Sequence, residues 1–210
     1  MQLCNTGLAK INQYLLLLCT VVIISACATR VDNVHRVILD NGITYVLQPI
    51  PNKLINTGIQ ALFTVKQQGK KNQFLMQVEM TQSQLLISGM TVEGLSLFTF
   101  DWQTQLGTLN YDKKIAIEPL RVLAELQLVL WPLADIAQGL EGAEMKVITK
   151  RHREISSAQG IIYQIKQQAN ISHLINLKQH YSITIAELER WQLTKESSAN
   201  NNLPPKVVKN

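Results

Sequence analysis

The chain has 210 residues, 46% of them hydrophobic, with a formal net charge of +5 and three cysteines. This length suits one domain and allows a core to form without disulfide support. Three cysteines exclude a fully paired disulfide framework, and the low glycine and proline content excludes collagen-like or proline-rich disorder.

The N-terminal segment has the pattern of an exported lipoprotein. Residues 14–24 read YLLLLCTVVII, an uncharged apolar run that follows one basic residue, Lys10. This run is typical of a secretory signal and is shorter than the ~20 apolar residues of a membrane span. The next residues, ISAC at 24–27, resemble the bacterial lipobox. The resemblance implies cleavage before Cys27 and acylation of Cys27 on its sulfur and new amino group. A plain secretory signal and an uncleaved anchor are the alternatives.

The lipobox also predicts a location and a set of boundaries. Ala28, rather than Asp, follows the cysteine. By resemblance to lipoprotein sorting, this implies delivery to the outer membrane, facing the periplasm. Each buried acyl methylene contributes ~0.8 kcal/mol, so three chains would anchor the protein stably. We therefore expect four regions, namely a signal peptide at 1–26, an acylated tether at 27–33, a folded domain at 34–193 and a disordered polar tail at 194–210. Cleavage would remove the other two cysteines, leaving no free thiol and no disulfide.

Strand patterns occupy the first part of the predicted domain. Residues 35–39 and 43–47 flank an Asn-Gly pair, which is a strong hairpin signal. A link rich in breakers follows at 50–56. Alternating apolar residues then predict a half-buried antiparallel pair on either side of a polar turn at 68–72. Further short strands are expected at 84–90, 95–102, 106–111 and 115–117.

A helix is expected at 119–131, PLRVLAELQLVLW. Proline suits the first helical position, and the preceding Glu118 favours a helix N-terminus. The segment is apolar nearly all round, which indicates burial on more than one side. Pro132 ends or kinks it, and strands return at 145–148, 161–165, 171–177 and 181–185.

These elements predict an α+β fold that is mainly β. A sheet of this many strands should curl rather than stay flat. The apolar helix would then plug the concave side of a curled antiparallel sheet, an unclosed half-barrel.

Three strings carry a resemblance to known proteins: LFTFDW at 97–102, LAELQLVLWP at 123–132 and YSITI at 181–185. With the element order, they resemble the LolA/LolB-like fold over about residues 59–188. More closely, they resemble a family of bacterial outer-membrane lipoproteins of unknown function, whose members often sit beside aryl-polyene or fatty-acid-type biosynthetic genes. The resemblance implies a hydrophobic cavity for acyl chains and a protruding loop that touches the membrane.

The candidate site residues follow from this resemblance. Those expected to line the cavity, with ordinary core packing as the alternative, are Phe63, Phe74, Phe98, Phe100, Leu123, Leu126, Leu130 and Trp131. The loop corresponds to residues 89–94, where Glu93 stands in place of the expected leucine. Met90 and Val92 are therefore the candidate membrane-touching residues.

No catalytic or metal-binding pattern stands out, so we expect no enzyme activity, cofactor or metal. The four histidines are scattered, and Asp101 and Glu118 are single carboxylates without a visible partner. The basic run at 150–153 is interpreted as a solvated strand end or, alternatively, a contact with anionic lipid headgroups.

Two functional hypotheses follow. In the first, the protein binds or transfers lipid or acyl-type ligands at the outer membrane, to which its N-terminal acyl chains attach it. In the second, it is a non-carrier scaffold that binds an envelope protein or a partner in a polyene or fatty-acid-type biosynthetic system. We expect a monomer that does not bind nucleic acid.

Overall fold

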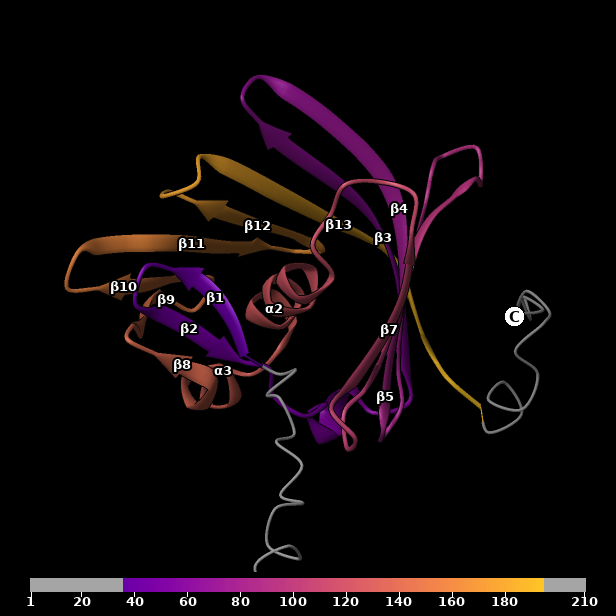
Figure 1. Cartoon of the computed structure of the whole chain (residues 1–210), viewed down its shortest axis with the longest axis horizontal. Helices are drawn as coiled ribbons and strands as arrows, with labels where there is room; N and C mark the ends of the chain where they lie inside the picture. Colours follow the sequence, from indigo (N-terminus) through magenta and orange to yellow (C-terminus); the bar gives the residue numbers. More distant parts are fainter. Residues whose placement is uncertain (1–35, 195–210) are drawn as a thin grey trace, which may run out of the picture. The chain divides into compact units, whose positions relative to one another are not determined.

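The computed structural model describes residues 36–194 (Figure 1). The predicted signal peptide and tether, with Cys27, and the tail beyond Thr194 lie outside the described residues. No helix within residues 36–194 is long and apolar enough to cross a membrane.

One large antiparallel sheet dominates the described region. Its ten strands lie in the order β7-β6-β5-β4-β3-β13-β12-β11-β10-β9, so β7 and β9 are free edges and the sheet does not close. The predicted unclosed, mainly β fold is therefore confirmed. The strands are β3 (Thr57–Gln67), β4 (Lys70–Met80), β5 (Gln84–Met90), β6 (Ser96–Gln103), β7 (Thr108–Lys113), β9 (Glu144–Thr149), β10 (His152–Ser157), β11 (Gly160–Gln168), β12 (Ile171–Asn176) and β13 (Tyr181–Gln192).

The β3–β4 hairpin shows how the sequence sets this sheet. Its turn is only two residues long, because Gln67 pairs with Lys70. Both turn residues, Gln68 and Gly69, have positive φ angles, of 49° and 77°. Such turns match the twist of the flanking strands. The period-two pattern then places alternate residues of both strands on the concave face.

Two helices and a small sheet complete the described region. Helix α2 (Pro119–Leu130) is followed at once by α3 (Leu133–Gly139), a short helix that the sequence pattern did not predict. The small sheet has the order β1-β2-β8, with β1 (Arg36–Asp40), β2 (Ile43–Val46) and β8 (Leu140–Glu141). A single 3-10 turn, η1 (Asn52–Leu54), lies in the link between β2 and β3.

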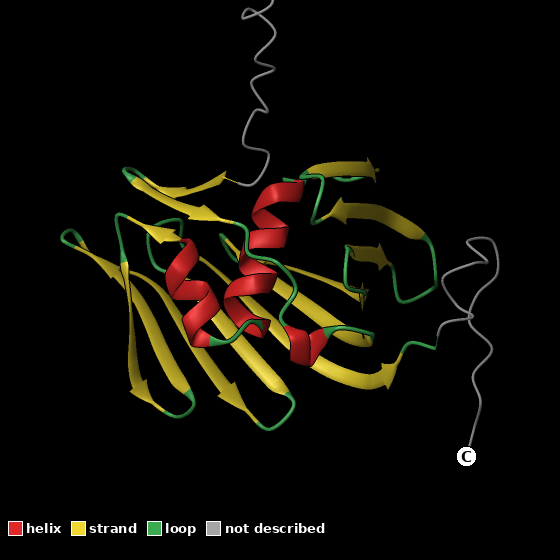
Figure 2. Cartoon of the chain, turned by 90° about the horizontal axis from the view of Figure 1, so that it is seen from below, coloured by secondary structure: helices red, strands yellow, loops and turns green. Residues whose placement is uncertain are grey.

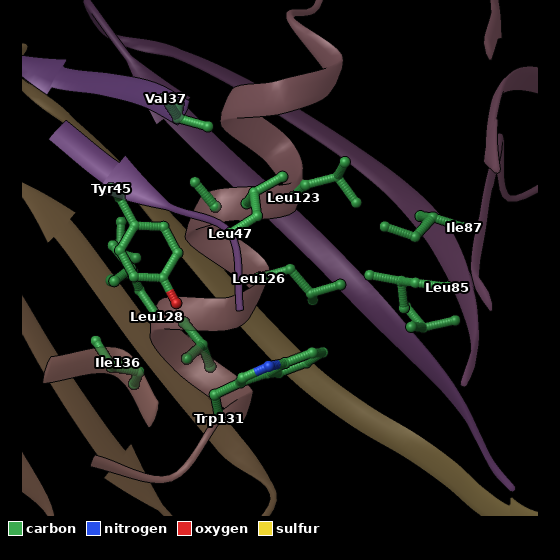
Figure 3. Close-up of a cluster of buried hydrophobic side chains, with 14 of the residues drawn as sticks. Val37, Tyr45, Leu47, Leu85, Ile87, Leu123, Leu126, Leu128, Trp131 and Ile136 are labelled. Carbon is green, nitrogen blue, oxygen red and sulfur yellow. The ribbon is translucent and has the colours of Figure 1, made fainter. Parts of the chain in front are cut away.

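Helix α2 lies on the concave side of the large sheet, and the small sheet covers its other side (Figures 1 and 2). Tyr45 and Val37 approach α2 from the small sheet, whereas Leu85 and Ile87 belong to the large one (Figure 3). All four side chains are buried. The helix is therefore packed on opposite sides, as its apolar surface indicates.

Gln127 connects α2 by hydrogen bonds to β2 and to the segment that follows this strand. Its Oε1 accepts hydrogen bonds from the Tyr45 hydroxyl (3.0 Å) and the Gln48 amide (2.8 Å), and its Nε2 donates to the Gln48 carbonyl (3.0 Å). The indole of Trp131 donates to the carbonyl of Pro49 at 2.9 Å. Gln127 is fully buried, so water cannot replace these bonds.

The C-terminal end of α2 is bound by the large sheet. Nη2 of Arg153 on β10 donates to the carbonyls of Leu128 (2.5 Å) and Val129 (2.7 Å). Gln167 on β11 donates to Val129 as well, at 3.1 Å. A cation is favoured here because helix carbonyls lack partners and carry partial negative charge. Burial lowers the pKa of Arg153 to about 10.

Three expectations about single elements are corrected. Residues 115–117 form a bend instead of a strand. Strand β10 was missed because its sequence, HREISS, has a single apolar residue, Ile155, and because its inward positions include the arginine that binds α2. Strand β13 extends to Gln192, beyond the expected 181–185, because its C-terminal half pairs with the N-terminal half of β3, from Ala61 to Thr57.

We expect Gln127→Leu to lower the free energy of unfolding by about 1–3 kcal/mol, because it leaves buried groups of Tyr45 and Gln48 without partners at little change in volume. Urea denaturation measures the effect. Gln138→Leu, on the exposed face of α3, is the matched control and should change stability little. Equal losses in the two variants would contradict this role of Gln127.

Candidate functional site

A hollow of about 250 Å³ lies between α2 and the concave face of the large sheet. Strands β3, β4, β6, β12 and β13 contribute to its wall, together with the residues just before α2. The wall is mainly apolar. We call this space the first hollow. Its volume is just below the ~300–1,000 Å³ typical of ligand pockets.

A row of aromatic rings crosses the sheet at this level. Phe63 on β3 stacks on Phe74 of β4, with ring centres 5.7 Å apart, and Phe74 meets Phe98 of β6 edge to face at 5.7 Å. Phe98 in turn stacks on Phe100 at 4.8 Å. Gly89 on β5 leaves room for the Phe98 ring, because a Cβ atom at this position would collide with it. The rings of Phe63, Phe74 and Phe98 form a continuous apolar floor of the first hollow, which we call the aromatic floor.

A second hollow, of about 390 Å³, lies farther along α2. It is bounded by the C-terminal half of α2, by η1, and by strands β3, β4 and β11 to β13. Its wall is about half polar. The two hollows share four wall residues, which we call the partition: Phe63, Leu126, Val129 and Ile185.

The structure distributes the residues predicted to line a cavity. Four of them lie on the wall of the first hollow: Phe63, Phe74, Phe98 and Leu126. Leu130 lies on the wall of the second hollow. The remaining three are fully buried in the packed core and lie on neither wall: Phe100, Leu123 and Trp131.

A polar network borders the first hollow. Both Tyr163 on β11 and Tyr181 on β13 donate to the same oxygen, Oε1, of Glu125 on α2, the Tyr163 bond being 3.1 Å long. Arg121, one turn earlier on α2, donates to the Tyr163 hydroxyl at 2.9 Å and lies 3.9 Å from Glu125 Oε1. Asn176 donates to the Tyr181 hydroxyl at 3.3 Å. The network links α2 to three strands.

The environment of Glu125 favours its neutral form. Burial raises the pKa of this carboxyl, against the opposing effects of the Tyr181 hydrogen bond, Arg121 and Tyr163. Burial also raises the pKa of the two tyrosines. The other oxygen of Glu125, Oε2, has no hydrogen-bond partner among residues 36–194. The Glu125 side chain also forms part of the wall of the first hollow.

The sequence pattern alone does not reveal this network. Its only local signal is Arg121 and Glu125, two opposite charges four residues apart in an otherwise apolar helix. The tyrosines are 38 and 56 residues away from Glu125 along the chain, so only the folded sheet brings them together.

The predicted membrane-touching residues lie at the β5–β6 turn. Met90 ends β5 and is half-buried, whereas Val92 is 65% exposed. Leu95, in the same turn, is 69% exposed and was not singled out from the sequence. Hydrogen bonding from Thr91 lowers the pKa of Glu93 in this turn.

The polar residues considered for chemistry lie apart from one another. The amides of Gln84 and Gln103 donate to Asp101, at 2.9 and 2.8 Å, and Glu118 precedes the first turn of α2. Within residues 36–194, no three His, Cys, Asp or Glu side chains are grouped so as to hold a metal ion. In the basic run, Lys150 and Arg151 are exposed, but Arg153 points inward to α2.

A family model matches residues 58–189, well over half of the chain, and thus nearly the whole large sheet and α2. The family is described as "Protein of unknown function (DUF3261)". The chain belongs to this family. No curated protein matches it. A crystal structure described as an outer membrane lipoprotein-sorting protein domain from Vibrio parahaemolyticus aligns with a TM-score of 0.32 and 7% identity, over 69% of this chain and 89% of that one.

The raised pKa of Glu125 predicts a pH dependence. The folded protein holds the carboxyl proton more tightly than the unfolded chain, so this contribution to stability is present below the pKa of an exposed glutamate. It is lost as the pH rises through the raised pKa. Glu125→Gln cannot titrate, and its free energy of unfolding should therefore rise relative to that of the native chain as the pH increases above ~4.3, the pKa of an exposed glutamate.

Parallel urea denaturation of both chains at increasing pH measures the difference. A relative stability of Glu125→Gln that falls with increasing pH would contradict the prediction, since it would mean that Arg121 and the phenols hold the carboxylate ionised.

Proposed function

We propose that this protein is a non-enzymatic lipoprotein of the bacterial envelope that binds a hydrophobic, acyl-type ligand between α2 and the large sheet. The observation that carries the proposal is the first hollow. Its mainly apolar wall encloses about 250 Å³ beside a helix that is itself buried. Concave, mostly apolar sites with a few polar groups are typical of small-molecule binding.

The wall chemistry supports an aliphatic ligand. The three phenylalanines at positions 63, 74 and 98 present ring surface to the hollow, and branched aliphatic side chains from α2 and β13 complete its apolar wall. Burying an acyl chain there would remove its methylene groups from water at ~0.8 kcal/mol each. A ligand with several charges would lose hydration on a wall whose largely buried polar side chains, Arg121 and Glu125, are already hydrogen-bonded to tyrosines.

The lipobox at residues 24–27 supports attachment to the outer membrane, with the folded domain in the periplasm. The exposed Val92 and Leu95 of the β5–β6 turn are suited to touch a membrane surface. A hydrophobic ligand could then pass between the bilayer and the hollow without crossing bulk water.

One observation favours the alternative, a scaffold that binds a protein partner. Strand β9 is a free edge of the large sheet and exposes Val147 and Ile148, at 56% and 51%. Exposed apolar edge strands readily pair with another chain. Cross-linking that captures a specific envelope protein through β9, with no lipid bound in native mass spectrometry, would favour this alternative.

Ligand binding is tested by displacing a fluorescent fatty acid with hexadecanoic acid. Val65, on the wall of the first hollow, is half-buried, so Val65→Trp should fill the hollow and weaken binding at least about tenfold. Val147→Trp makes the same substitution on an exposed strand residue and should leave binding unchanged. The absence of saturable binding to the native chain, or equal binding by both variants, would overturn the proposal.

The membrane anchor is tested separately. Cys27→Ser removes the acylated thiol, so we expect the chain to be unprocessed or released from the outer membrane, with no incorporation of labelled palmitate. Cys19→Ser, in the predicted signal peptide, is the control and should leave fractionation unchanged. A Cys27→Ser chain that is still cleaved and still fractionates with the outer membrane would contradict the lipobox assignment.

A further inference from the structure

The two hollows lie end to end along one side of α2. The first lies beside Arg121 and Glu125, whereas the second extends past Leu130 at the C-terminal end of the helix. The partition alone contributes to both walls. Its members contribute apolar side chains and no ion pair. Two of them, Phe63 and Ile185, lie on the paired strands β3 and β13, whose backbone hydrogen bonds do not have to break when the side chains rotate. Rotation of these side chains would therefore join the hollows into one passage.

The passage has an apolar end and a polar end. The first hollow is mainly apolar, and the second is about half polar. Two cations, Lys53 on η1 and Arg190 on β13, and one anion, Glu187, line the second hollow. Arg190 pairs with Glu187 at 2.6 Å, whereas Lys53 has no ion pair or side-chain hydrogen bond among the described residues. The net charge of this end is therefore positive.

The polar groups of the first hollow are less suited to hold an anionic group. Arg121 already donates to Tyr163 and to the carbonyl of Leu39. Glu125 presents a carboxyl group on the same wall, and both tyrosine hydroxyls donate to it. An anion placed here would find these donors already used and would meet the carboxylate of Glu118 on the same wall. At the second hollow it would meet the ammonium of Lys53, because the carboxylate of Glu187 is already paired with Arg190.

We propose that the two hollows form one site for a single-chain amphiphile with an anionic headgroup. Its headgroup lies at Lys53 and Arg190, and its tail crosses the partition into the first hollow. The inference rests on the proposed function and deepens it, because it specifies the charge, the orientation and the chain-length dependence of the ligand. A tail too short to cross the partition gains nothing from the aromatic floor.

The partition is tested through chain length. The complete chain carrying Cys27→Ser, which lacks the acyl anchor, is titrated with dodecanoic and hexadecanoic acids. Leu126→Ala opens the partition. The preference for the longer acid, measured as the ratio of the two dissociation constants, should therefore increase about tenfold. Leu128→Ala removes the same atoms from an equally buried residue that points to the opposite side of α2, toward Tyr45 (Figure 3), and should leave the preference unchanged. An unchanged preference in Leu126→Ala, or the same change in both variants, would overturn the inference.

A second variant keeps the test decisive if Leu126→Ala does not fold. Phe63→Leu reduces the partition from the sheet side and should shift the preference in the same direction. If the native chain binds neither acid, the proposed function itself fails. If it binds both acids but the partition variants leave the ratio of the two dissociation constants unchanged, only the proposal of one continuous site fails.

The headgroup end is tested through charge. Lys53→Glu should weaken binding of hexadecanoic acid about tenfold while leaving binding of uncharged hexadecanol within about twofold. Lys71→Glu makes the same charge change on an exposed residue of the β3–β4 hairpin and should affect neither probe. Equal weakening of the acid by both lysine variants, or equal weakening of acid and alcohol by Lys53→Glu, would overturn the proposed orientation.

Discussion

A helix buried along most of its length cannot rely on water to satisfy its polar groups, and α2 meets this constraint with bonds on three sides. Gln127 binds the segment after β2, Glu125 receives two phenol hydroxyls from the large sheet, and Arg153 covers the C-terminal carbonyls. Each bond joins α2 to a part of the chain far away in sequence. The helix is thus held in a defined position, and the hollows beside it keep a defined shape.

The position of α2 also explains why space remains in the interior. Where α2 meets the small sheet, around Tyr45 and Leu128, the apolar side chains are fully buried. On the β3 and β13 side, phenylalanine and aliphatic side chains leave a hollow, and the polar network of Glu125 borders it. The bonds that fix the helix therefore also preserve a hollow that hydrophobic collapse alone would tend to close.

Much of the architecture follows from local patterns. Period-two alternation and the Asn-Gly pair at 41–42 predict the hairpins, and the apolar segment after Pro119 predicts α2 nearly to the residue. The failures have a common cause. Strand β10 and helix α3 are short, and neither has a repeating apolar pattern. Their residues are suited to contacts with α2 and the small sheet instead.

By itself, the sequence determined the half-barrel class and the buried helix, because periodicity reports which side of an element is buried. Only the tertiary structure decided that Phe100, Leu123 and Trp131 pack in the core while Phe74 and Leu126 border open space. It alone assembled Glu125 with its tyrosines and turned Arg153 inward. Periodicity assigns a side chain to a face, but whether that face meets a neighbour or a hollow depends on how distant elements pack.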